Sequence, residues 1–210
     1  LVGIHAYLEK FSGDSEVRRM RKILAENLFN MFKKNVTKEW PWPEKEVCYA
    51  NGKFAHALLL SGQWMQREDM IETGLNSLQW LLKIQTEDGH FSPIGNNGWY
   101  EQGKTKARFD QQPIEANAMI EACVEAFNIT RNRMWLDSAV MCFNWFLGHN
   151  DLNLSLYDPK TGGCRDGLMA DGINQNEGAE SSLAWLLSLM ELQNLYSNEL
   201  LKQPISKLTV

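Results

Sequence analysis

The sequence contains no long apolar run and little cysteine, and both absences exclude classes of protein. No apolar stretch approaches the roughly 18 residues that a membrane-spanning helix requires. The four cysteines, Cys48, Cys123, Cys142 and Cys164, do not have the spacing of a metal site. Three of them fall in helical patterns, where we interpret them as small core residues, so a reducing, cytoplasmic setting is expected.

The sequence also lacks an excess of positive charge. The net charge is −5 and the pI is near 5.4. Lysine and arginine cluster only at residues 18–22, at the start of a predicted helix, so no nucleic-acid partner is expected. The sequence also lacks a glycine-rich strand-loop-helix for a nucleotide and a His, Cys or acidic cluster for a metal. We therefore predict no metal and no cofactor.

What the sequence does contain is helical periodicity along most of its length. Its 210 residues predict a single domain over residues 1–200, followed by a tail over 201–210. An amphipathic helix is predicted over about 15–34. Its packing stripe would consist of Val17, Met20, Leu24, Leu28 and Met31.

The helical pattern then repeats. Mostly apolar helices are predicted over about 47–62 and 113–128, each joined by a short turn to an amphipathic partner, and a third apolar helix over about 177–197. Short motifs recur about 65 residues apart, since Ala50-Asn51 is matched by Ala116-Asn117. This repeat predicts stacked helical hairpins, with about seven helices in all.

Long loops precede the three apolar helices, at about residues 35–46, 87–112 and 149–176. We expect all three loops on one face, where the helix N-termini offer free N–H groups and the positive end of the helix dipole. A small β-hairpin is predicted in the third loop, with residues 154–157 and 164–168 flanking a turn rich in Pro and Gly.

The side chains expected on this face suit a saccharide, because aromatic rings stack on the C–H faces of sugars and planar groups bond hydroxyls in pairs. Asp110 and Glu180 are the predicted catalytic acids. The predicted binding residues are Trp40, Trp42, Tyr49, Asn51, His90, Trp99, Arg108, Gln111, Gln112, Glu115, Asn117, Tyr157, Arg165, Asp166, Asn174 and Glu177.

Structural alternatives remain open for these residues. The aromatic side chains could only pack the loops together, and the acids could cap helices or sit in first turns, where the helix dipole favours them. Arg108 and Arg165 could hold loops through salt bridges to Asp110 or Asp166. Asn51 and Asn117 could simply tie neighbouring helices together.

Several of these motifs together resemble a known family. They are RFDQQPIE at 108–115, LYDP at 156–159, GGCRDG at 162–167 and NQNEGAES at 174–181. Residues 36–196 are similar to the helical region that follows the glycosyltransferase part in many bacterial group 1 glycosyltransferases, within the six-hairpin glycosidase-like superfamily. The resemblance implies an all-α fold, an α/α toroid, in a glycan-handling context. A closed ring of six hairpins needs about twelve helices, so the ring is either open or part of a longer chain.

Three functions follow as hypotheses. The first is a carbohydrate-binding or carbohydrate-processing domain that works with a bacterial glycosyltransferase catalytic domain and takes a saccharide ligand. The second is a free-standing enzyme, either a glycoside hydrolase with two carboxyl groups or a sugar epimerase using His56 and His90. The third is a non-catalytic assembly domain that forms homo-oligomers through the open edge of the toroid.

Overall fold

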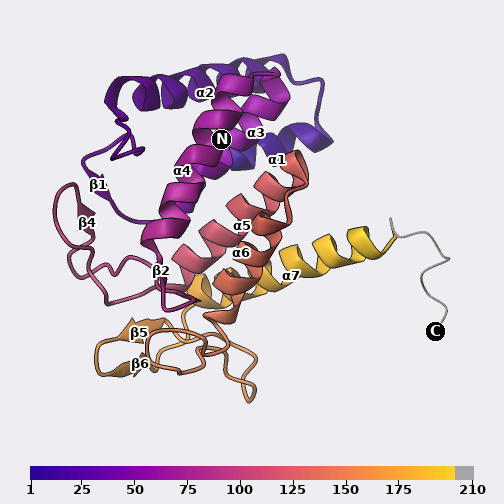
Figure 1. Cartoon of the computed structure of the whole chain (residues 1–210). Coiled ribbons are helices and arrows are strands. Elements are labelled where there is room, and N and C mark those ends of the chain that lie inside the picture. The colour runs from indigo at the N-terminus through magenta and orange to yellow at the C-terminus, as the bar shows by residue number, and fades with distance from the viewer. Residues whose placement is uncertain (202–210) are drawn as a thin grey trace.

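Seven α-helices form the framework of the chain in a computed structural model that describes residues 1–201 (Figure 1). The all-α class is therefore confirmed. All of the predicted tail except Leu201 lies outside the described residues. The helices are α1 (Val2–Lys10), α2 (Ser15–Asn35), α3 (Gly52–Met65), α4 (Glu68–Ile84), α5 (Pro113–Thr130), α6 (Arg133–Asn144) and α7 (Ala179–Leu201).

Helix α5 lies at the centre of the molecule. It packs against α3, α6 and α7, while α4 packs mainly on α3. The helix begins at Pro113, whose fixed φ and missing N–H suit a first helical position. Most of its residues are buried, as its apolar periphery predicts. The predicted hairpins α3–α4 and α5–α6 are confirmed, with α3, α5 and α7 as the inner helices.

Two details of the helix predictions are wrong. Helix α3 begins at Gly52 instead of at about 47, because Glu46 and Val47 form strand β1 and Ala50 has a positive φ of 52°. Helix α2 buries a stripe around Ala25, Phe29 and Phe32, whereas the predicted stripe shares only Leu28 with it. The other apolar side chains of that predicted stripe include Met20, Leu24 and Met31, which are exposed.

Short strands connect the long loops. Strand β1 (Glu46–Val47) pairs with β4 (Tyr100–Glu101), and Gln111 forms an isolated bridge with Leu168. These pairs join the first loop to the second and the second to the third. The prediction that the three loops share one face is therefore confirmed (Figure 1).

The third loop contains a β-hairpin, but not at the predicted residues. Strands β5 (Gly167–Met169) and β6 (Gly172–Asn174) pair with each other, and β2 (Thr86–Glu87) pairs with β3 (His90–Phe91) in the second loop. At the predicted place only Tyr157 and Cys164 form a bridge. The turn between them still closes, because the Asp158 carbonyl accepts the Gly162 N–H at 2.8 Å.

Helix α7 exposes one apolar stripe. The exposed side chains of this predicted apolar helix include Leu183, Leu186, Leu187 and Met190. A closed ring would cover this stripe with a further hairpin, so the exposed stripe marks the open edge of the helical array. Within the described residues, no helix combines the length and apolar character needed to cross a membrane.

Candidate functional site

A polar cavity of about 390 Å³ opens where the second and third long loops meet the start of α7. Its walls come from the end of the second loop, from the β5–β6 hairpin and from the first turn of α7. Six of the twelve lining residues are predicted site residues, including both predicted catalytic acids. The lining residues are Asn96, Asp110, Gln111, Gln112, Asp166, Gly167, Met169, Asn174, Gly178, Ala179, Glu180 and Ser181.

Two close backbone contacts build this cavity. The Asn96 N–H donates to the Asp110 carbonyl at 2.9 Å, so the segment carrying Asp110 runs along the segment carrying Asn96. Gly95 is needed there, because a Cβ at that position would lie 2.1 Å from the Phe109 carbonyl oxygen. Gln111 and Leu168 exchange two backbone hydrogen bonds of 2.9 Å each, which fix the β5–β6 hairpin beside the start of α5.

The three acids of the cavity differ in what they bind. Asp166 accepts the Gly178 N–H and the Ser181 hydroxyl, both at 2.7 Å, and also bonds the Asn176 amide. Burial alone would raise the pKa of Asp166, but these hydrogen bonds lower it below its usual value. Asp166 therefore serves to hold the first turn of α7 and the loop before it.

The carboxylates of Asp110 and Glu180 accept fewer hydrogen bonds than that of Asp166. No described residue donates a hydrogen bond to the Asp110 carboxylate. Glu180 accepts one hydrogen bond of 2.7 Å, from the hydroxyl of Tyr49. This bond raises the pKa of Tyr49 to about 12, because losing the phenolic proton would place two negative charges side by side. Both carboxylates are thus available to a ligand in the cavity.

Asp151 does not line the cavity but binds residues that support its wall, and it was not among the predicted residues. Its carboxylate accepts from Arg108 Nε at 2.9 Å and from Gln111 Nε2 at 2.6 Å. Gln111 in turn accepts the indole N–H of Trp145 at 2.8 Å, and His90 Nε2 lies 3.7 Å from Asp151. Arg108 and Gln111 therefore support the cavity wall, and the salt bridge predicted for Arg108 has Asp151 as its partner.

Glu115 is a buried structural acid. It lies in the first turn of α5, with 0% of its surface exposed, and accepts the Ala50 N–H at 2.6 Å and the Asn51 N–H at 3.2 Å. The Asn51 side-chain amide donates to it as well, at 2.7 Å. Since Asn51 makes no side-chain cap of its own, the Glu115 carboxylate from α5 caps the N-terminus of α3.

The ionisation of Glu115 predicts a pH effect on stability. Burial raises its pKa from 4.5 to about 7, although the N–H groups of Ala50 and Asn51 act in the opposite direction. Because the folded state holds this proton more tightly, its contribution is complete below pH 4.5 and is lost as the pH rises through about 7. We expect the free energy of unfolding of the wild type relative to Glu115→Gln to fall over this range. Urea titrations at several pH values measure it, and a difference that rises with pH would contradict the expectation.

Several predicted residues lie outside the cavity. Trp40 and Trp42 are 4% and 2% exposed, and their indole N–H groups donate to the Glu44 and Glu46 carbonyls. Asn117 is buried and ties α5 to α7 through Ser188 at 3.2 Å, as its structural alternative stated. No ring of these tryptophans is available for a sugar in this cavity, and none of its twelve lining residues is aromatic.

The remaining predicted residues hold the loops. Trp99 packs against the main core, and Tyr157 stacks on Trp185 with ring centroids 4.7 Å apart. Arg165 Nη2 lies 2.5 Å from Asp158 Oδ2, and Arg165 Nη1 lies 3.2 Å from Glu177 Oε1. Neither predicted epimerase histidine lines the cavity, since His56 Nδ1 lies 3.5 Å from Glu121 and His90 faces Asp151.

Asn96, Met169 and Ser181 line the cavity without having been predicted. Asn96 belongs to an Asn-Asn-Gly stretch that indicates only a turn, and Met169 precedes the tight connection between β5 and β6. Ser181 directly follows the predicted catalytic acid Glu180 in α7, and this adjacency is the sequence signal that could have identified it as a cavity residue.

Neither protein-family models nor curated proteins give a match to this sequence. Among solved structures, the chain is similar to a selenomethionine derivative of a GH76 α-mannanase from Bacteroides thetaiotaomicron, with a TM-score of 0.55 and 17% sequence identity. The similarity covers 72% of this chain and 40% of the mannanase chain, so the chain spans less than half of that structure. At this identity the likeness establishes the fold alone, and the chain has the helical-hairpin architecture of an α/α toroid.

Proposed function

We propose that this chain binds an oligosaccharide in the polar cavity and cleaves a glycosidic bond there. The observation that carries the proposal is the presence of two carboxylates on one cavity, Asp110 with no hydrogen bond from a described residue and Glu180 with a single one from Tyr49. Hydrolysis of a glycosidic bond uses such a pair, one group protonating the leaving oxygen and the other acting as base or nucleophile. The α/α-toroid fold, shared with an α-mannanase, supports a carbohydrate ligand.

The remaining lining groups fit sugar hydroxyls. Asn96, Gln112 and Asn174 supply amides, each able to donate and accept hydrogen bonds. Tyr49 orients Glu180 from the side of α3, so the acid is held by an element other than its own helix. Because the lining has no aromatic side chain, recognition in this cavity would rest on hydrogen bonds instead of ring stacking.

Two finer parts of the proposal concern partners. The motifs at residues 108–115 and 174–181 support a role beside a bacterial glycosyltransferase catalytic domain, on sequence resemblance. The exposed apolar stripe of α7 supports association through the open edge of the toroid, with a second copy or with further hairpins. Co-purification and light scattering at several concentrations would test each of these associations.

Proton NMR of the anomeric region tests the catalytic proposal, with α-mannan oligosaccharides as the first substrates and other bacterial oligosaccharides after them. We expect the wild type to produce new anomeric signals. Asp110→Asn should lower the rate by about 100-fold or more, because loss of a general acid or base has effects of that size. Binding, followed by line broadening, should change much less.

Asp171→Asn is the matched control, since Asp171 is exposed in the same region and does not line the cavity. It should retain the wild-type rate. Full turnover by Asp110→Asn would place the reaction elsewhere. Broadening without new signals in the wild type would indicate a binding module. The absence of both broadening and new signals would favour the assembly hypothesis.

A further inference from the structure

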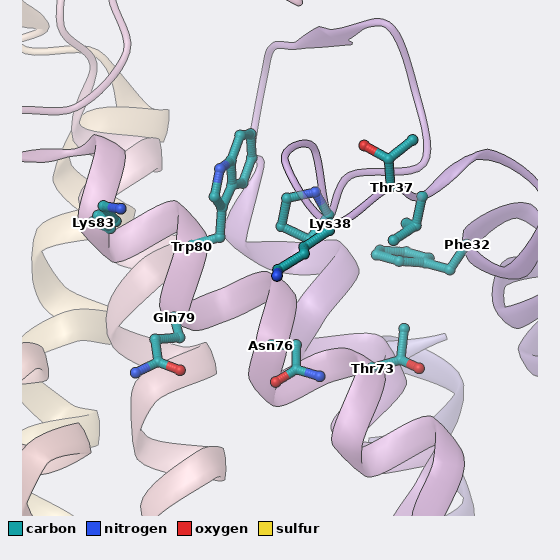
Figure 2. Close-up of a pocket in the computed structure, with 10 residues that line it drawn as sticks. Phe32, Thr37, Lys38, Thr73, Asn76, Gln79, Trp80 and Lys83 are labelled. Carbon is teal, nitrogen blue, oxygen red and sulfur yellow. The ribbon is translucent and has the colours of Figure 1, made fainter.

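A second and larger cavity lies away from the polar cavity that contains Asp110 and Glu180. It has a volume of about 830 Å³ and opens between the end of α2, the loop that follows it and α4 (Figure 2). It shares no lining residue with the polar cavity. Its size falls within the roughly 300–1,000 Å³ of ligand-binding pockets, so it can hold more than an isolated ion.

One wall of this groove is a single face of α4. Thr73, Asn76, Trp80 and Lys83 follow one another at intervals of three or four residues, and Gln79 lies beside them (Figure 2). The side-chain amides of Asn76 and Gln79 make no hydrogen bond with the described residues. Two unpaired amides on one wall offer donors and acceptors in the arrangement that sugar hydroxyls require.

The opposite wall is a loop held rigidly in place. The Thr37 N–H donates to the Trp40 carbonyl at 3.1 Å, and the Trp40 N–H donates to the Thr37 hydroxyl oxygen at 3.1 Å. The buried Trp40 contacts Trp80 edge to face at 4.9 Å, and Trp42 stacks on Trp80 at 6.5 Å. Trp80 itself is partly exposed and lines the groove. These contacts fix both walls before a ligand arrives, which lowers the entropy cost of binding.

The groove has charge of one sign. Lys38 reaches from the loop toward α4, and Lys83 lies at the other side of Trp80 (Figure 2). Neither lysine forms an ion pair with any described residue, and no acidic residue lines the groove. Two ammonium groups without a protein partner therefore flank an aromatic ring and two amides.

We propose that this groove binds an anionic oligosaccharide. The ring edge of Trp80 would contact the C–H surface of a sugar, the amides of Asn76 and Gln79 would bond its hydroxyls, and Lys38 and Lys83 would pair with its acidic groups. A small free anion would use only the lysines. The site is independent of the cavity with Asp110 and Glu180, and it would hold a charged glycan on the outer surface of the fold.

Isothermal titration of the full chain with tetragalacturonate tests this site. We expect saturable binding that weakens as NaCl rises from about 0.02 M to about 0.5 M, because salt screens the lysine charges. The double variant Lys38→Gln with Lys83→Gln should bind about tenfold more weakly or worse, since two charge-assisted contacts are lost. Asn76→Ala should weaken binding with no change in the salt dependence.

The control removes the same charge elsewhere. Lys10→Gln with Lys22→Gln alters two exposed lysines outside the groove and should bind as the wild type does. Asp110→Asn should also bind normally, which separates this site from the proposed catalytic one. No saturable binding, equal losses in both lysine pairs, equal affinity for neutral mannotetraose, or full competition by inorganic phosphate would each overturn the proposal.

Discussion

Replacing Gly52 with alanine is expected to lower the stability of the fold by about 3 kcal/mol, or about 6–12 °C in Tm. Gly52 is the first residue of α3 and faces the backbone of α5. A Cβ there would lie 2.6 Å from the Ala118 carbonyl oxygen and 2.9 Å from the Met119 nitrogen. Because the contact is between two helix backbones, relief requires that α3 and α5 move apart.

Gly3→Ala is the matched control for this prediction. Gly3 is also a helical glycine, in α1, but a Cβ there would meet nothing within 4 Å. Alanine favours helix more than glycine does, so this variant should be neutral or slightly stabilising. Thermal unfolding followed by circular dichroism measures both. Equal Tm values for Gly52→Ala and the wild type would show that the two inner helices do not approach this closely.

Glu115→Ala should destabilise the chain by about 4 kcal/mol, since it leaves two buried donors and one part-buried donor without an acceptor, and each unsatisfied buried donor costs about 1–3 kcal/mol. The donors are the N–H groups of Ala50 and Asn51 and the side-chain amide of Asn51. Asn51 also accepts a hydrogen bond of 3.1 Å from Gln85, so the loss extends to the end of α4. Chemical denaturation measures the difference.

Glu125→Ala provides the comparison on the same helix. Glu125 is partly buried, forms no hydrogen bond within the described residues, and has its pKa raised by burial. Its removal should therefore cost little or stabilise the fold. A loss for Glu115→Ala no greater than that for Glu125→Ala would mean that the Glu115 carboxylate does not cap α3.

Much of the architecture could be predicted because it depends on local patterns. The start of α5 follows from Pro113 and from the apolar periodicity after it. The short turns between apolar and amphipathic helices predict the hairpins. The packing side of α2 could not be predicted, because Met20, Leu24 and Met31 offer as good a helical stripe as Ala25, Phe29 and Phe32. Periodicity shows that a helix has an apolar face, but it does not show which of two apolar faces packs against the core.

The candidate site divides in the same way. Asp110 and Glu180 were predicted from their places before and within helix starts. Trp40 and Trp42 were predicted to bind a saccharide on the loop face, yet both rings pack in the core. Asp151 was missed because its partners Arg108 and Gln111 lie 43 and 40 residues away in the sequence. Such contacts depend on the assembled loops.

The capping of α3 by Glu115 also bears on how the chain can be dissected. The N–H groups of Ala50 and Asn51, the two residues before the first inner helix, find their acceptor in the next hairpin, about 65 residues further on. A fragment that ended after α4 would keep every residue of its own hairpin and still lack that acceptor. The helical hairpin that repeats along the sequence is therefore not an autonomous folding unit, and the hairpins should unfold together as one cooperative block.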